Sequence, residues 1–398
     1  MKKLYCLATG ILMLNTVFAQ SAKFKTDTQL LQTIDGDYKD AVSQYKFMAT
    51  ELEPGKFPKT YYPAEKKFAT SESDWWCSGF YSGTLLQLYK ATGDVALQKD
   101  ANSSLEGLTK EQFNKSTHDL GFMMYCSFGT AQKVEPNDQY KQILINSAKS
   151  LATRFDPKVG CIKSWDSKKP EYLVIIDNMM NLELLFWGTH VTDDSSFYKI
   201  AVTHANTTMK NHFRPDYSSY HVVVYDPENG SVKQKRTAQG YADESAWARG
   251  QSWGLYGYTV MYRETHNKKY LDQADHIAHF ILNNPNLPKD KIPYWDYNAP
   301  NIPDALRDAS AGAVMASALL ELCKYTDAAN AQLYFKTAET IIRNLSGPTY
   351  LAAPGTNGGF ILEHSVGSLP GKSEVDVPLT YADYYFIEAL GRYKAFAK

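Results

Sequence analysis

The sequence predicts an all-α fold, an (α/α)6 barrel made of six helical hairpins. Two observations favour it: apolar residues recur at helical spacing along most of the chain, and the helical segments are of two kinds that alternate. One kind carries a charged face, whereas the other is apolar nearly all round and rich in Gly, Ala and Ser. Because a helix with a polar face lies outside and a helix that is apolar on every side is buried, the alternation predicts an outer and an inner ring.

The segments with a charged face are the expected outer helices. They cover residues 28–51, 97–113, 137–154, 196–213, 269–283 and 331–345. The apolar segments, which are the expected inner helices, cover residues 76–91, 119–132, 177–189, 246–264, 309–325 and 381–393. Gly250, Gly254 and Gly257 in the fourth inner segment let neighbouring helices approach closely. No fixed sequence period relates the hairpins, so an open repeat array is not indicated.

Three long irregular stretches, residues 214–244, 285–308 and 346–378, are expected to form the mouth of the barrel. Loops on a rigid scaffold usually carry the function of a protein. Within the first of them, residues 220–225 alternate weakly and run into Asp-Pro-Glu-Asn-Gly, which predicts a small β-hairpin. No low-complexity linker divides the chain, so we expect residues 20–398 to form a single catalytic domain.

The first nineteen residues have the pattern of a secretory signal. Lys2 and Lys3 precede the apolar stretch 4–18, and Val-Phe-Ala at 17–19 is a small-x-small cleavage site. We therefore expect cleavage near Ala19 and a periplasmic or secreted protein. Later segments lack the apolar length of a transmembrane helix, so no membrane insertion is expected.

Composition excludes several classes of protein. The formal net charge is −1, which excludes nucleic-acid binding driven by bulk positive charge. The cysteines after the signal show no CxxC spacing and the histidines no HExxH pattern, so neither a metal site nor a cofactor is indicated. We expect mostly free, buried thiols at Cys77, Cys126, Cys161 and Cys323. The expected assembly is a monomer or a weak homo-oligomer.

Two aspartates open inner helices. Asp177 heads the apolar third segment, and Asp119, preceded by His118, heads the second. A buried carboxylate is costly, and proteins accept that cost mostly where a proton is moved. Helices that start in parallel would bring both acids to one end of the barrel, where their pKa values can split between acid and base roles. The alternative is that each aspartate simply caps its helix.

The fourth inner helix carries Arg249 and Trp253, which are four residues apart and share a face. A guanidinium suits a carboxylate and an indole suits a sugar ring, so the pair fits a uronic acid. The alternative is that Arg249 pairs with Asp243 or Glu244 and that Trp253 belongs to the core.

Other candidates lie in the loops that lead into inner helices. His221 and Gln239 are placed to hydrogen-bond sugar hydroxyls, or they are ordinary loop residues. Trp75, Trp76 and Trp165 line a carbohydrate cleft or belong to the core.

Taken together, several segments resemble the unsaturated glucuronyl hydrolases of glycoside hydrolase family 88. The segments are Trp-Cys-Ser-Gly-Phe at 76–80, His-Asp-Leu-Gly-Phe at 118–122, Ser-Trp-Asp at 164–166, Ile-Asp-Asn-Met-Met-Asn at 176–181, His221, Gln-Gly-Tyr at 239–241 and Trp-Ala-Arg-Gly-Gln-Ser-Trp at 247–253. The family fold is an (α/α)6 barrel, which agrees with the helix alternation. The resemblance implies that Asp177 is the general acid and base and that Asp119 is a second essential carboxylate.

The resemblance also implies a set of substrate-binding residues. They are Trp76, His118, Trp165, His221, Gln239, Arg249 and Trp253. Trp76 and Trp253 would flank the sugar. Some family members bind a sulfate through serines and a lysine of the last mouth loop, where this chain has Ser365, Ser368 and Lys372. Here the lysine follows the second serine by four residues, and a solvated turn is the alternative.

The function expected from this resemblance is a glycosaminoglycan-degrading hydrolase. It would remove the 4,5-unsaturated glucuronic acid from the non-reducing end of lyase-generated oligosaccharides by hydrating the vinyl ether. The ordinary geometry rule for two glycosidase carboxylates then does not apply. The alternatives are an unsaturated rhamnogalacturonyl hydrolase that acts on pectin lyase products and a non-catalytic sugar-binding barrel.

Overall fold

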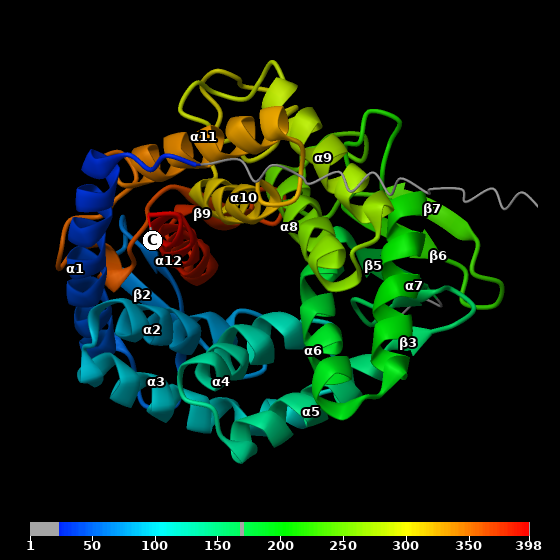
Figure 1. The fold of residues 1–398 in the computed structure, drawn as a ribbon, viewed down its shortest axis with the longest axis horizontal. Helices are drawn as coiled ribbons and strands as arrows, with labels where there is room; N and C mark the ends of the chain where they lie inside the picture. Colours follow the sequence, from blue (N-terminus) through cyan, green and yellow to red (C-terminus); the bar gives the residue numbers. More distant parts are fainter. Residues whose placement is uncertain (1–23, 168–170, 398) are drawn as a thin grey trace, which may run out of the picture.

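The computed structural model describes residues 24–167 and 171–397. The expected secretory signal, residues 1–19, lies outside the described residues. Figure 1 shows a ring of inner helices surrounded by an outer ring, with α12 in the inner ring on the side of α1. The inner and outer assignments from the sequence are confirmed throughout this ring, and the fold is an (α/α)6 barrel.

The inner ring contains α2 (Ser78–Thr92), η2 (Gly121–Gly129) with α4 (Thr130–Val134), η3 (Ile176–Asn181) with α6 (Leu182–Thr192), α8 (Ala248–Thr265), α10 (Ala309–Leu322) and α12 (Thr380–Ala395). The outer ring contains α1 (Thr28–Glu51), α3 (Val95–Leu108) with η1 (Thr109–Phe113), α5 (Asp138–Ala152), α7 (Ser195–Asn211), α9 (Lys268–Asn283) and α11 (Ala328–Leu345).

Short turns lead from inner to outer helices at one end of the barrel. Inner helices α2, α6 and α8 end at Gly93, Asp193 and His266, each in the left-handed conformation. The outer helix that follows is then capped by an Asp or Asn side chain, which accepts a backbone N–H of the first turn. These caps are Asp94, Asn137, Asp194, Asn267 and Asp327. This end of the barrel is therefore closed by tight connections.

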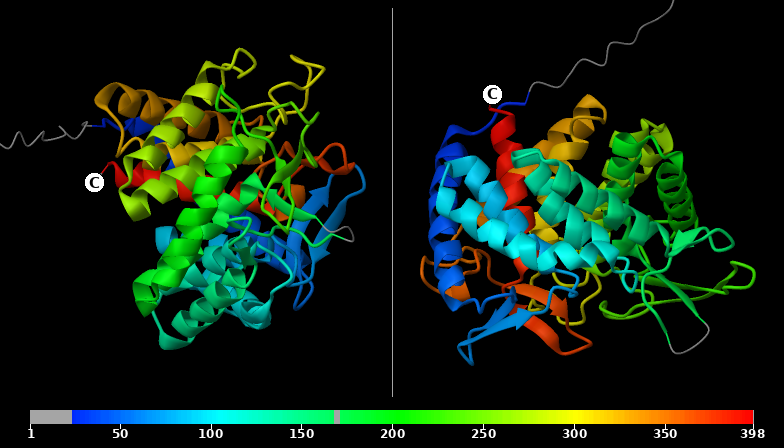
Figure 2. Two further views of the ribbon diagram at one scale, coloured as in Figure 1. Left: turned by 90° about the vertical axis from the view of Figure 1, so that its right-hand side faces the viewer. Right: turned by 90° about the horizontal axis from the view of Figure 1, so that it is seen from below.

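All strands gather at the opposite end (Figure 2). They are β1 (Phe57–Tyr62) with β2 (Lys67–Ser71), β3 (Phe155–Asp156) with β4 (Cys161–Ile162), β5 (Tyr172–Ile175) with β6 (Val222–Tyr225) and β7 (Val232–Arg236), and β8 (Ser365–Ser368) with β9 (Ser373–Val377). The hairpin expected after residue 220 is confirmed as β6–β7. The remaining strands were not expected from the sequence.

Strand β5 brings two distant parts of the chain together. It pairs antiparallel with β6, with Ile175 opposite Val222, and the Ile176 amide donates to the His221 carbonyl at 3.0 Å. Asp177 follows β5 and His221 precedes β6, so this register places the two side chains beside each other.

The second and third inner helices also approach closely at the mouth. η2 is a π-helix, a form that is often found at functional sites. Its Phe122 amide donates to Asn181 Oδ1 at 3.0 Å. The start of η2 is thereby tied to η3, and Asp119 is tied to the region of Asp177.

The four cysteines after the signal were expected to be mostly free and buried. Cys77, Cys126, Cys161 and Cys323 are free and buried. No helix in the described part of the chain is both long and apolar enough to cross a membrane.

Candidate active site

Asp177 lies in the first turn of η3 and is only 9% exposed. Its Oδ2 is buried without a hydrogen-bond partner among the described residues. Burial raises the pKa of this carboxyl to about 7, with the charge of Arg249 opposing the shift and the charge of Asp119 adding to it. The group can therefore hold or release a proton near neutral pH, as a general acid and base must.

His221 faces Asp177 in one defined tautomer. Its Nδ1 accepts the backbone N–H groups of Ala238 at 3.1 Å and Gln239 at 3.2 Å. An imidazole nitrogen that accepts two N–H groups carries no proton, so the proton of the neutral ring is on Nε2. That Nε2 lies 3.7 Å from Asp177 Oδ2. Burial, assisted by the charge of Arg249, lowers the pKa of His221 to about 3, so the ring stays neutral.

Asp119 stands two residues before the start of η2 and is 9% exposed. Its Oδ2 accepts the Thr117 hydroxyl at 2.8 Å rather than an amide of η2, so capping does not account for this side chain. His118 Nε2 lies 3.3 Å from Asp119 Oδ1. Burial lowers the pKa of His118. Asp119 thus lies between a hydroxyl donor and an imidazole and is near enough for its charge to act on Asp177.

Three tryptophans of the site region pack against other rings. His221 packs on Trp247 at a centroid distance of 4.4 Å, and Trp165 meets the same imidazole edge-on at 6.1 Å. Trp76 is partly buried and lies 4.8 Å from the Tyr381 ring. Trp76 and Trp165 therefore keep accessible ring surface, as a sugar platform requires.

Trp253 is placed differently. Its indole is 0% exposed and packs between Phe122, at 5.2 Å, and Tyr385, at 5.5 Å. Trp253 is therefore a core residue, which was the alternative to sugar binding in the sequence analysis. Trp253 supports the floor of the site and does not present a free face to a sugar.

Arg249 is also engaged within the protein. It is 2% exposed, and its Nη1 donates to Asp308 Oδ2 at 3.0 Å. Nη2 donates to the Gly367 carbonyl at 2.6 Å and to Gln239 Oε1 at 3.3 Å. The acidic partner is thus Asp308 and neither Asp243 nor Glu244; Glu244 instead pairs with Arg214 at 3.4 Å.

The three residues of the last mouth loop do not converge. Ser365 is 0% exposed, and its Oγ accepts the Ser310 amide at 3.1 Å, at the start of α10. Ser368 Oγ accepts the Gly371 amide at 3.2 Å within the β8–β9 turn. Lys372 ends that turn with a φ of 51°. The Ser365 hydroxyl is consequently buried against the start of α10.

The sequence interpretation missed two contributors. Thr117 donates to Asp119, and nothing in its local pattern singles it out. Asp308 stands at the start of the apolar inner helix α10. The pattern that singled out Asp119 and Asp177, an aspartate at the head of an apolar helix, was therefore sufficient to find it.

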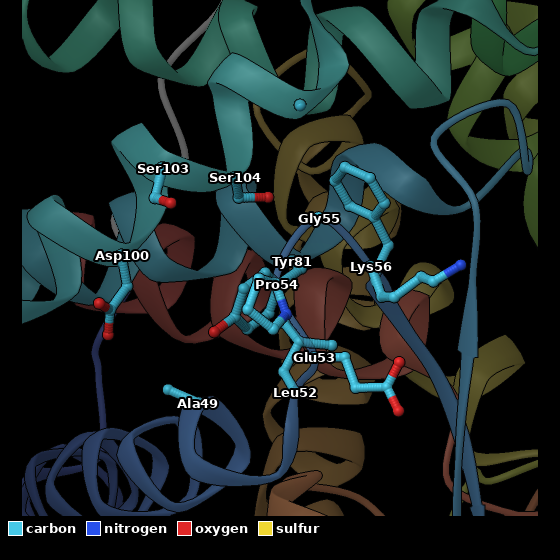
Figure 3. A pocket seen from close by; sticks show the side chains of 12 residues that line it. Ala49, Leu52, Glu53, Pro54, Gly55, Lys56, Tyr81, Asp100, Ser103 and Ser104 are labelled. Carbon is cyan, nitrogen blue, oxygen red and sulfur yellow. The ribbon is translucent and has the colours of Figure 1, made fainter.

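One hollow of the surface is lined by residues outside the candidate site. Figure 3 shows a groove of about 160 Å³ between the end of α1 and α3, lined in part by Tyr81, Asp100 and Ser104. None of the expected site residues lines it. Within residues 24–167 and 171–397, no group of three or more His, Cys, Asp or Glu side chains is arranged to hold a metal ion.

Comparisons with known proteins agree with this geometry. The family model described as Glycosyl Hydrolase Family 88 matches residues 50–286. An unsaturated glucuronyl hydrolase of Formosa agariphila is 43% identical over 390 residues, covering 97% of this chain and 96% of the relative. An unsaturated chondroitin disaccharide hydrolase of Streptococcus pneumoniae is 33% identical over 326 residues, covering 80% of this chain and 81% of the relative.

Solved structures are similar as well. An unsaturated glucuronyl hydrolase specific for heparin has a TM-score of 0.89 at 48% identity, covering 92% of this chain and 98% of that chain.

Proposed function

The chain belongs to glycosyl hydrolase family 88 and is an unsaturated glucuronyl hydrolase, and we propose that Asp177 and Asp119 are its catalytic carboxylates. The observation that carries the assignment is the buried Asp177 carboxyl, whose pKa is raised to about 7 beside the neutral His221. A carboxylic acid that stays protonated near neutral pH can deliver a proton to carbon, which an ordinary surface aspartate does poorly.

In the proposed reaction, Asp177 gives its proton to C4 of the 4,5-unsaturated ring. Positive charge then develops at C5 and the ring oxygen, and a water molecule adds its oxygen to C5. The Asp177 carboxylate takes a proton from that water and is ready for the next turnover. The resulting hemiketal opens, and the glycosidic bond then breaks.

The neighbouring groups serve this step through position and charge. His221 Nε2 lies 3.7 Å from Asp177 Oδ2, which is too far for a hydrogen bond but places the neutral imidazole beside the carboxyl. The Asp119 carboxylate opposes ionisation of Asp177 and stabilises positive charge on the sugar ring. Trp76, Trp165 and Gln239 are partly buried and are the proposed contacts of the sugar, whereas the buried His118, Arg249 and Trp253 support them.

The proposed substrates are oligosaccharides that a polysaccharide lyase has released from glycosaminoglycans. Heparin-derived disaccharides deserve the first test, because the similar structure at 48% identity is specific for heparin. Chondroitin-derived disaccharides come next, because a relative at 33% identity hydrolyses them.

Loss of the ultraviolet absorbance of the C4=C5 bond tests this function. The panel contains unsaturated heparin, chondroitin and rhamnogalacturonan disaccharides, each with wild type and Asp177→Asn. Bleaching of a glucuronyl disaccharide by wild type only is the expected result. Bleaching of the rhamnose-linked product alone would indicate the pectin enzyme, and binding without bleaching would indicate a non-catalytic barrel.

We further propose that the protein is exported to the periplasm or beyond the cell. The support is the sequence pattern of Lys2, Lys3 and the small-x-small site that ends at Ala19. N-terminal sequencing of the protein from its native cell should begin at Gln20. A native protein that still begins at Met1 would refute export by this route.

A further inference from the structure

Asp308 is a third aspartate that opens an inner helix at the mouth, and it is 0% exposed. Its Oδ1 caps α10, accepting the amides of Ser310 at 3.1 Å and Ala311 at 3.3 Å. Its Oδ2 accepts Arg249 Nη1 at 3.0 Å. We propose that Asp308 is a positioning residue that holds Arg249 on strand β8 and thereby sets the charge next to Asp177.

The other contacts of Arg249 show what this ion pair holds in place. Nη1 also donates to the Val366 carbonyl at 2.5 Å, and Nη2 donates to the Gly367 carbonyl at 2.6 Å. One guanidinium therefore joins α8 to β8, and Asp308 joins both to the start of α10. Among the described residues, Asp308 is the acid with which Arg249 forms an ion pair. Without that carboxylate, the buried guanidinium would keep its carbonyl partners but lose its counter-charge.

The inference rests on the proposed function, because Arg249 acts on the reaction through Asp177. The charged and titratable groups that face Asp177 are Arg249 from α8, Asp119 with its neighbour His118 from the start of η2, and His221 from the start of β6. Glu374 from β9 also acts on Arg249.

Arg249 opposes the raised pKa of Asp177, whereas burial and Asp119 maintain it. With Asp308 ionised, Arg249 and Asp308 form a neutral pair, and the field of the guanidinium at Asp177 is weakened. Without that carboxylate the field is stronger, and Asp177 loses its proton at lower pH.

Asp308→Asn is a sharp test, because asparagine caps helices as well as aspartate does. The Oδ1 acceptor for α10 is kept, whereas the ionised Oδ2 that pairs with Arg249 is lost. We expect the alkaline limb of the kcat/KM profile to move to lower pH by at least about 0.5 unit, with kcat reduced about tenfold or more. If Asp308 served stability alone, the substitution would lower the melting temperature and leave the alkaline limb of the kcat/KM profile unshifted.

Asp327→Asn is the matched control. Asp327 caps outer helix α11 in the same way, accepting the amides of Ala329 at 2.9 Å and Asn330 at 3.2 Å, and makes no contact with Arg249. Its pH profile should coincide with that of wild type. If Asp308→Asn does not fold, Asp308→Ser retains a helix cap without a charge or an amide donor, and the same shift is expected.

The outcomes separate the two levels of the proposal. Wild type that leaves every unsaturated disaccharide unbleached overturns the proposed function and this inference with it. If wild type hydrolyses a disaccharide but neither Asp308→Asn nor Asp308→Ser shifts the alkaline limb of the kcat/KM profile, only the positioning role is overturned. A shifted limb in the Asp308 variants and an unshifted limb in Asp327→Asn support it.

Discussion

Gly121 lies against Asn181 with no space for a side-chain carbon between them. A Cβ added at Gly121 would be 2.4 Å from the Asn181 Cα, and the next amide, that of Phe122, donates to Asn181 Oδ1 at 3.0 Å. The two residues join the second and third inner helices two residues after Asp119 and four after Asp177. This contact therefore sets the separation of the two acids.

Gly121→Ala should separate these helices and displace one acid from the other. We expect kcat/KM to fall by about 100-fold, because a displacement near 1 Å is enough for such a loss. Overpacking should also lower the free energy of unfolding by about 1–3 kcal/mol. Gly36→Ala is the control, because Gly36 lies in α1 with no atom within 4 Å of an added Cβ. Wild-type kinetics in Gly121→Ala would contradict the proposed packing role.

The pH dependence of turnover should follow the protonation of Asp177. Its pKa is raised to about 7, so the protonated fraction that can donate to C4 decreases as the pH rises above that value. We expect kcat/KM to fall about tenfold per pH unit on the alkaline side. His221, with a pKa lowered to about 3, does not titrate in this range. A profile measured on an unsaturated disaccharide that stays flat to pH 9 would refute the assignment.

Glu321 holds two arginines near the closed end of the barrel. It accepts Arg263 Nη1 at 2.9 Å and lies 2.8 Å from Arg392 Nη1. Burial opposes its ionisation, but the two arginines hold its pKa at about 2. The stabilisation is therefore present above the unfolded pKa and is lost as the pH falls toward 2.

Glu321→Gln should lower the free energy of unfolding by about 3 kcal/mol, because it leaves buried guanidinium charge uncompensated. Turnover should be unchanged, since the proposed catalytic carboxylates lie at the opposite end. Lys336→Gln breaks an exposed ion pair with Glu339 and should cost less than about 0.5 kcal/mol. Denaturant unfolding of the three proteins measures both effects, and equal losses in the two variants would contradict the account.

Asp383 ties the last mouth loop to α12. Its carboxyl accepts the amides of Ile361 at 3.0 Å and Leu362 at 2.9 Å, and burial raises its pKa to about 7 despite these donors. Between about pH 4 and pH 7 the folded protein therefore binds more protons at this site than the unfolded chain does. Its contribution to stability is complete below that window and declines as the pH rises through it.

Asp383→Asn removes this titration. The difference in unfolding free energy between wild type and variant should shrink from pH 5 to pH 8, on the order of 2 kcal/mol. Other titrating groups are shared by the two proteins and cancel in the difference. Guanidinium unfolding at both pH values measures it, and a difference independent of pH would show that Asp383 keeps its ordinary pKa.

Local patterns were enough to predict the helices of the barrel, because amphipathicity separates inner from outer segments within one helix length. The strands were harder, since β5 at residues 172–175 pairs with β6 at residues 222–225, and no local signal links them. The π-helical form of η2 was also missed, because the Gly121–Asn181 contact that accompanies it joins separate helices.

The same distinction holds for the site. Asp119 and Asp177 are recognisable because each precedes an apolar helix. The partner of Arg249 is Asp308, 59 residues away, whereas sequence proximity suggested Asp243 or Glu244. Likewise, the tautomer of His221 follows from the amides of Ala238 and Gln239, whose orientation only the fold determines.

The parallel arrangement of the inner helices has a consequence for how fast an anionic sugar arrives. Each of these helices begins at the mouth, so their positive dipole ends point toward the entrance, while Lys and Arg side chains collect in last turns at the far end. An approaching uronate is thus attracted before it makes contact. The second-order rate constant at low substrate should accordingly decline as salt is added, even though the overall charge of the chain is slightly negative.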